Sequence, residues 1–258
     1  MDNHTNTARP SRAMRIEADA FFEALDVTSP DSLSACAGWT THDVTAHFAA
    51  AAVEVALNLE AYGEGRPVPL TRGFEEREAP YRAMGHDQLR TQLPISIERA
   101  AVALDAVLNS QPDAVVPWTG REMVVATFIT HMRSELALHR WDLVGDDDVS
   151  AVLLAQPELT DHAVTVLGRA LVARGAASDS TNIHATISAP GTQDVIALVD
   201  GDGARLIHGE ETSDPVVIGD PAARLLFLWG RRPGDPRRLV APRGHQLLAR
   251  LENLLAGY

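Results

Sequence analysis

Side chains that commonly bind metal ions recur at helical spacing late in the first half of the sequence. Glu135 and His139 are four residues apart, so on a helix they lie on one face, about one turn apart. His131 precedes Glu135 by about one turn, and Asp142 follows His139 by about one turn. A carboxylate and a neutral imidazole in this arrangement can bind one divalent cation and leave a position open for water or substrate. Because a buried glutamate without a partner costs several kcal/mol, the pattern favours a metal site.

A further imidazole is needed to complete such a site, and the sequence offers several. His47 lies on an otherwise apolar stripe of another expected helix, whereas His42 and His131 are nearby alternatives. Spacing alone does not choose among them. It also leaves open that His47 is a hydrogen-bonded core histidine, and that Glu135 and His139 form a buried ion pair or part of a solvated face.

The elements that must position these residues are helical. Apolar residues recur at three- and four-residue intervals, and Thr40 or Thr41 can cap the second helix, with Asp43 in its first turn. Residues 64–85 are expected to form a long connection with one helical turn, and Pro94 should kink or interrupt the third helix. Helices are expected at residues 11–25, 41–59, 86–108 and 120–144, which predicts an up-down four-helix bundle.

The second half of the sequence has a different character, in which short runs of β-forming residues alternate with Gly and Asp. An acidic run at residues 146–148 marks the boundary, which predicts domains at 1–148 and 149–258. The fold class is therefore α+β. Expected strands cover residues 184–188, 195–198, 204–208 and 215–218, and expected helices cover residues 158–173, 220–228 and 244–255.

Composition excludes several classes of protein. The chain has 258 residues, 45% of them apolar, and a net charge of −13, which argues against broad binding to nucleic acid. Its single cysteine, Cys36, cannot form an intramolecular disulfide, and we interpret it as a small buried apolar residue. No signal peptide or membrane-spanning run is recognisable. We therefore expect a cytoplasmic, soluble monomer or homodimer with no nucleic-acid or membrane partner.

Three segments carry a resemblance to a known family. The run Gly38-Trp-Thr-Thr-His-Asp-Val-Thr-Ala-His47 resembles the G-W-T-x-x-D-V-x-x-H segment of the DinB-like metal-dependent thiol transferases. Residues 131–143 resemble the second metal motif of that family. Residues 217–231 resemble the sterol-carrier-like C-terminal domain of one branch, the mycothiol-dependent maleylpyruvate isomerases. The three motifs occur in the family's order and cover most of the chain.

The resemblance implies roles for particular residues. His47, Glu135 and His139 would be the metal ligands, and Asp142 would hydrogen-bond a ligand or a metal-bound water. Arg231 would be the C-terminal arginine that contacts substrate, although Arg232 and Arg238 are close enough to be alternatives. His131 is then a residue of helix packing or of the metal's outer shell.

The chemistry implied is activation of a thiol by a metal. Zinc suits two imidazoles, a carboxylate and an open position, and nickel or another divalent ion could use the same ligands. A metal holds a bound thiol as its thiolate, and the resemblance implies that mycothiol supplies this thiol. The thiolate would add to an electrophilic carbon of the substrate. An isomerase then allows a C–C bond to rotate and expels the thiol, whereas an S-transferase keeps the conjugate.

Three other functions use the same residues. The protein could exchange thiols on a biosynthetic intermediate. It could be a non-catalytic module that binds a small apolar or thiol-bearing ligand between its two domains. It could also be a hydrolase in which a metal-bound hydroxide is the nucleophile. Dependence of activity on an added thiol discriminates among these alternatives.

Overall fold

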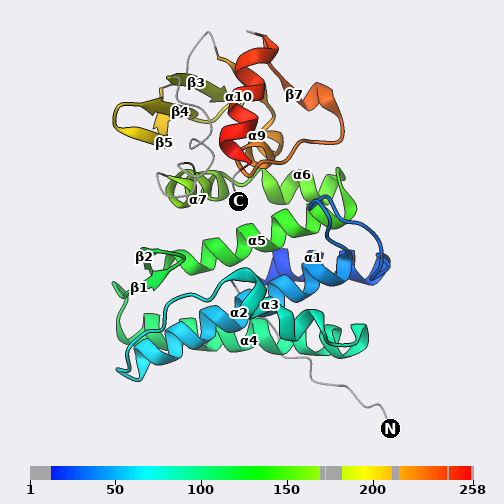
Figure 1. The fold of residues 1–258 in the computed structure, drawn as a ribbon, viewed down its shortest axis with the longest axis vertical. Coiled ribbons are helices and arrows are strands. Elements are labelled where there is room, and N and C mark those ends of the chain that lie inside the picture. Colours follow the sequence, from blue (N-terminus) through cyan, green and yellow to red (C-terminus); the bar gives the residue numbers. More distant parts are fainter. Residues whose placement is uncertain (1–12, 169–171, 173–181, 211–214, 243, 257–258) are drawn as a thin grey trace. The chain divides into compact units, whose positions relative to one another are not determined.

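The computed structural model describes residues 13–168, 172, 182–210, 215–242 and 244–256. The chain divides into two compact units, residues 1–144 and 145–258, a few residues before the predicted boundary at 148. The first unit is mainly helical and the second contains a sheet (Figure 1). This confirms the predicted α+β class with the helical part first. None of the described helices is long and apolar enough to cross a membrane.

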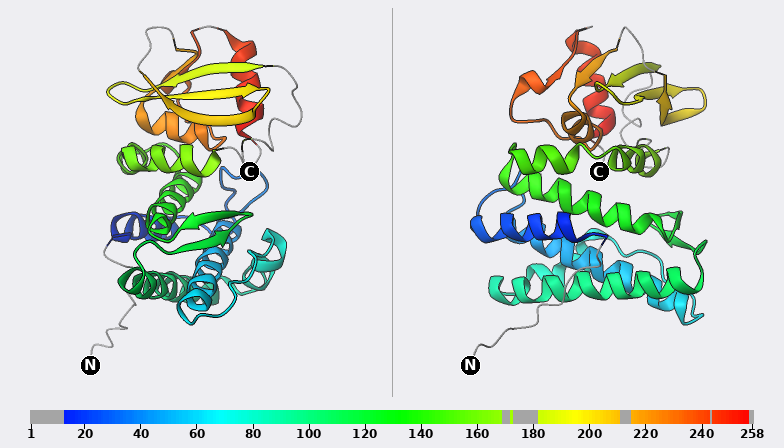
Figure 2. Two further views of the ribbon diagram at one scale, coloured as in Figure 1. Left: turned by 90° about the vertical axis from the view of Figure 1, so that its left-hand side faces the viewer. Right: turned by 180° about the vertical axis from the view of Figure 1, so that it is seen from behind.

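The helices of the first unit surround a common core. In Figures 1 and 2, α2 runs beside α4 and α3, and α1 runs beside α5; α2 also contacts α5. Each long helix contributes completely buried side chains to this core, including Phe21, Phe48, Ile97 and Leu136. Burial of these apolar faces stabilises the unit. The helices are α1 (Arg15–Val27), α2 (Thr41–Gly63), α3 (Phe74–Arg82), α4 (His86–Ser110) and α5 (Thr127–Val144).

The helix expected from residue 120 begins later, at Thr127, so that boundary was wrong. The preceding residues form an antiparallel hairpin of β1 (Val115–Trp118) and β2 (Arg121–Val124). Both residues of its two-residue loop have positive φ, 48° at Thr119 and 82° at Gly120. Such a loop matches the twist of a tight hairpin, which explains why a glycine follows Thr119.

Two details of the predicted connections also differ. The segment between the second and third expected helices contains α3, a helix of nine residues, which is longer than the single turn expected. The predicted interruption at Pro94 is absent, because α4 runs continuously from His86 to Ser110 with Pro94 inside it.

The start of α2 is fixed by a capping box. The backbone N–H of Asp43 donates to the Thr40 hydroxyl (3.2 Å), and the backbone N–H of Thr40 donates to the Asp43 carboxylate (2.9 Å). Because this pair satisfies two N–H groups that have no partner within the helix, Thr40→Ala should lower the free energy of unfolding by about 1 kcal/mol. Urea denaturation would measure the change. Thr91→Ala, at an exposed site inside α4, is the control, and equal losses in both variants would contradict the prediction.

The second unit is built around a five-stranded mixed sheet with the strand order β5-β4-β3-β6-β7. Only β3 and β6 pair in parallel, and the other neighbours are antiparallel. α9 and α10 pack together, and α10 lies beside the sheet (Figure 2). The strands are β3 (Ile183–Ser188), β4 (Asp194–Asp200), β5 (Gly203–Gly209), β6 (Val217–Gly219) and β7 (Leu239–Val240), and the helices are α6 (Asp148–Leu154), α7 (Pro157–Leu167), α9 (Pro221–Leu228), η1 (Pro236–Arg238) and α10 (His245–Leu255).

The expected strands of this unit all occur, within a few residues of their predicted bounds. α6 and the two-residue strand β7 were not expected from the sequence. The helix expected at residues 158–173 ends earlier, at Leu167, where Gly168 follows with a positive φ of 30°; residues 169–171 and 173 lie outside the described residues. The likeness of residues 149–258 to a sterol-carrier domain stays a prediction.

Candidate metal centre

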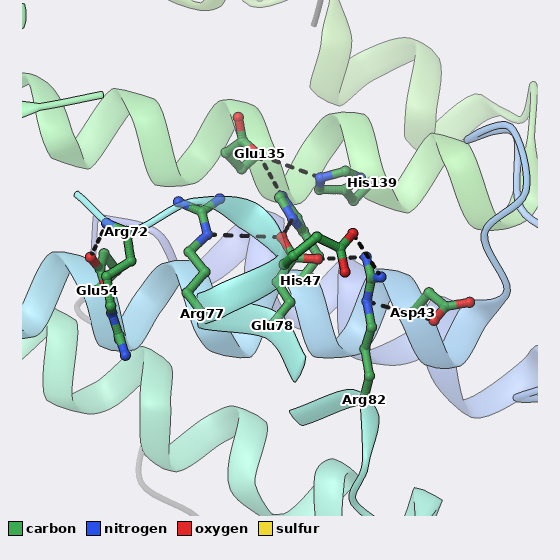
Figure 3. Close-up of polar contacts among 10 residues, drawn as sticks. Asp43, His47, Glu54, Arg72, Arg77, Glu78, Arg82, Glu135 and His139 are labelled. Atoms are coloured by element: carbon green, nitrogen blue, oxygen red, sulfur yellow. Dashed lines mark hydrogen bonds and ion pairs between the residues drawn. The ribbon is translucent and has the colours of Figure 1, made fainter. Parts of the chain in front are cut away.

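Three predicted ligands from two helices meet in the first unit. His47 comes from α2, and Glu135 and His139 come from α5 (Figure 3). The Nε2 atoms of His47 and His139 lie 3.7 Å and 3.4 Å from Oε2 of Glu135. One ligand atom from each residue lies within 4.8 Å of the others, close enough for all three to bind one ion.

The other two candidate histidines have different surroundings. Nε2 of His42 lies 3.1 Å from the backbone carbonyl oxygen of Arg82. The ring of His131 packs edge-on against Trp118 and Phe128, and burial lowers its pKa despite the nearby Glu135 carboxylate. The geometry therefore selects His47 from the histidines that spacing left open.

Both imidazoles at the centre are oriented by a carboxylate on their far side. Nδ1 of His47 lies 2.7 Å from Oε1 of Glu78, and Nδ1 of His139 lies 2.8 Å from Oδ2 of Asp142. Each Nδ1 can donate a proton to its carboxylate, so that Nε2 is the nitrogen that faces Glu135; loss of a proton from Nε2 would free a lone pair there for a cation. Metal-binding histidines in proteins are commonly held in this way.

Glu78 is the main residue that the sequence analysis missed. It lies on α3 and is completely buried, and it also accepts a 2.7 Å hydrogen bond from Nη2 of Arg82. The segment looked like an exposed connection because it is rich in charge and contains proline. The signal available was the spacing of Glu78 and Arg82, which are four residues apart and can pair on one helix face.

Hydrogen bonds and charges at the centre outweigh the effect of burial on its ionisation. Burial alone would raise the pKa of Glu135, but hydrogen bonds with His139 and His47 hold it well below its ordinary value. Burial opposes the charged form of His139, yet bonds with Asp142, Cys36 and Glu135 raise its pKa well above the usual range. The Glu135 carboxylate is therefore ionised and available as a ligand at neutral pH.

Cys36 lies next to this centre, and the interpretation of it as a buried apolar residue was wrong. Its side chain is half-buried, and its thiol donates to Oδ2 of Asp142 at 3.2 Å. The neighbouring N–H of Ala35 donates to the backbone carbonyl of Asp142 at 2.8 Å, which holds the loop against α5. Sγ of Cys36 and atoms of His139 and Asp142 form a second group of closely spaced potential ligand atoms.

The predicted substrate-binding arginine belongs to the second unit. Nη1 of Arg231 donates to the backbone carbonyl of Trp229 at 3.1 Å, just after α9. The alternatives Arg232 and Arg238 pair with carboxylates of the same unit. The role of Arg231 toward a substrate stays a prediction.

Fold and centre together define a class of protein. A helical unit carries two imidazoles and a carboxylate in the arrangement typical of divalent-cation sites, and a mixed α/β unit follows it. The family model described as the mycothiol maleylpyruvate isomerase N-terminal domain matches residues 11–144, more than half of the chain. The chain belongs to this family of enzymes, so the identification made from the sequence motifs is confirmed.

Solved structures agree with this membership at the level of the fold. One is a crystal structure of the mycothiol-dependent maleylpyruvate isomerase, with a TM-score of 0.66 and 16% sequence identity. Another is a mutant of that enzyme in which a histidine is replaced by alanine, with a TM-score of 0.65 and 16% identity. Each comparison covers 90% of this chain and 91% of the other. No curated protein sequence matches this chain.

Proposed function

We propose that this chain is a metal-dependent enzyme that uses the small thiol mycothiol as a nucleophile on an electrophilic small molecule. The observation that carries the proposal is the convergence of His47, Glu135 and His139 within 4.8 Å. Family membership supports the thiol-dependent isomerase chemistry. Isomerisation is the favoured reaction, because the solved structures that resemble this chain are those of an isomerase.

The donor set suits a divalent cation, and zinc is the ion we propose. Two imidazole nitrogens and one carboxylate are the protein ligands of many catalytic zinc sites, which keep a further position open. Each imidazole has its Nδ1 held by a carboxylate, so both Nε2 atoms can serve as ligands. A cation bound there would supply Lewis acidity, which lowers the pKa of a bound thiol.

Four side chains of this chain have different roles in the proposed reaction. Glu78 and Asp142 orient the two imidazoles and fix which nitrogen carries the proton. Glu135 contributes negative charge between the two imidazoles, from a side chain that is 19% exposed. Arg231 is proposed to hold a substrate carboxylate, for which its planar guanidinium is suited.

The reaction is balanced without any further reactant. The mycothiol thiolate forms a C–S bond to one carbon of a double bond that is conjugated to a carbonyl group. The π electrons of that double bond move onto the carbonyl oxygen, and the former double bond becomes a single bond that rotates. The electrons then return to re-form the double bond as the C–S bond breaks and the thiolate leaves. An S-transferase would stop at the adduct after protonation of the carbon.

The test is the dependence of turnover on both thiol and metal. Zinc-loaded protein is mixed with maleylpyruvate and mycothiol, and isomerisation is followed by product chromatography; monochlorobimane serves as an S-transfer probe. We expect turnover only when thiol and metal are both present, and its loss when a chelator strips the metal. Turnover without thiol would indicate a hydrolase. A binding module would be indicated by the absence of turnover, together with an absorption spectrum of the cobalt-substituted protein that added thiol does not change.

A further inference from the structure

Arg77 is a buried arginine whose guanidinium makes no hydrogen bond to any residue in the described part of the chain. It lies on α3 directly before Glu78, and its side chain is only 6% exposed. Its guanidinium stacks on the ring of Phe74, 4.5 Å from the centroid. Among the residues that the structure describes, none hydrogen-bonds the guanidinium, and Nε is completely enclosed without a partner.

The carboxylates around Arg77 are already engaged by other groups. Oε1 of Glu78 lies 3.8 Å from Nε of Arg77, but that carboxylate accepts hydrogen bonds from Arg82 and interacts closely with His47. Glu135 contacts the two histidines of the centre. Arg77 therefore has negative charge nearby, but no described residue serves it as a hydrogen-bond acceptor.

A neighbouring arginine, Arg72, has a guanidinium that is hydrogen-bonded to a carboxylate. Arg72, just before α3, binds Glu54 through Nε and Nη2 at 2.9 Å and 2.6 Å. Both guanidinium donors converge on Oε2 of Glu54, and the backbone N–H of Arg72 donates to Oε1 at 2.8 Å. Because Glu54 is occupied by Arg72, it is not available to Arg77.

Leaving a buried guanidinium without an acceptor is costly, because its desolvation is not compensated. Burial accordingly lowers the pKa of Arg77, although Glu78 and Glu135 partly oppose this. The guanidinium points toward α5, the helix that carries Glu135 (Figure 3). A divalent cation at the centre would add positive charge nearby and increase the need for an anion.

We propose that Arg77 binds a carboxylate group of the electrophilic substrate beside the metal centre. A carboxylate matches the planar fork of unused donors, whereas a thiolate offers one atom and is the natural ligand of the cation. The inference rests on the proposed function and assigns to Arg77 the recognition of a carboxylate close to the reactive carbon. It places this contact on the helical unit.

The test is binding of maleate by calorimetry, without thiol, to zinc-loaded and to metal-stripped protein. Arg77→Gln should weaken maleate binding by about 10- to 100-fold. Arg99→Gln, on α4, is the matched control, since it removes the same charge from an exposed pair with Glu60 of α2 and should leave the affinity nearly unchanged. Dimethyl maleate, which has the same shape without charge, should bind wild type and Arg77→Gln equally weakly.

Maleate affinity that is unchanged in Arg77→Gln, or absent in the wild type, would overturn the proposal. Arg77→Lys keeps the positive charge but lacks the planar pair of guanidinium donors, so this variant should also bind maleate more weakly than the wild type does. It replaces Arg77→Gln in the experiment if Arg77→Gln does not fold. Metal content and thiol binding of the wild type are measured separately. A wild type that holds no metal would contradict the proposed function. Even then, weaker maleate binding by metal-stripped Arg77→Gln than by metal-stripped wild type would support a carboxylate site at Arg77.

Discussion

Replacing His47 with alanine is expected to abolish stoichiometric binding of a divalent cation. The substitution removes the only ligand that α2 contributes to the group of His47, Glu135 and His139, leaving two ligands on one helix. The loss of affinity should exceed the roughly 10- to 100-fold effect typical of removing an outer hydrogen-bond partner of a metal ligand. Elemental analysis of protein dialysed against a zinc buffer measures the remaining metal.

His42→Ala is the matched control for this experiment. His42 lies on the same helix, but its Nε2 contacts the backbone carbonyl of Arg82, so its replacement should leave the metal content unchanged. Circular dichroism checks that both variants fold. Full metal content in His47→Ala would mean that the cation, if one binds, is held by a different set of residues.

Replacing Glu78 with glutamine should weaken metal binding by about 10- to 100-fold, although Glu78 touches no metal ligand atom. The carboxylate only accepts hydrogen bonds, and its partner at 2.7 Å is Nδ1 of His47. A glutamine amide can instead donate to Nδ1, which favours the tautomer with a proton on Nε2, the nitrogen that must bind the cation. Competition with a chromophoric chelator measures the affinity.

A second acidic residue of α3 provides the comparison. Glu75 is an exposed partner of Arg82, with 90% of its side chain accessible, and Glu75→Gln removes the same charge without touching His47. We expect near-native metal affinity in that variant. If Glu78→Gln bound zinc as tightly as Glu75→Gln, Glu78 would be a structural partner of Arg82 and not an orienting group for the ligand.

Most of the centre could be predicted from local sequence because its donors follow helical spacing. Glu135, His139 and Asp142 lie on one helix, so their proximity follows from the period of the helix. The cap at Thr40 fixed where α2 begins, as expected. The meeting of His47 with α5 required tertiary packing, and only the family resemblance selected it from the other histidines.

The features that were missed depend on contacts between distant segments. Glu78 is buried because α3 packs on α2, which its polar sequence does not reveal. Cys36 reaches Asp142 although 106 positions separate them. The hairpin before α5 was missed because the helix expected at residues 120–144 extends over its second strand, whereas Gly120 has a positive φ and closes the turn.

The adjacency of Arg77 and Glu78 on α3 has a consequence for cooperativity. Successive side chains of a helix diverge by about 100°, so one short helix can face the imidazole of His47 and a ligand anion at once. Any shift of α3 would alter both interactions together. Occupancy of the cation site and of the anion site should therefore be thermodynamically coupled, and by reciprocity each would change the affinity for the other by the same factor.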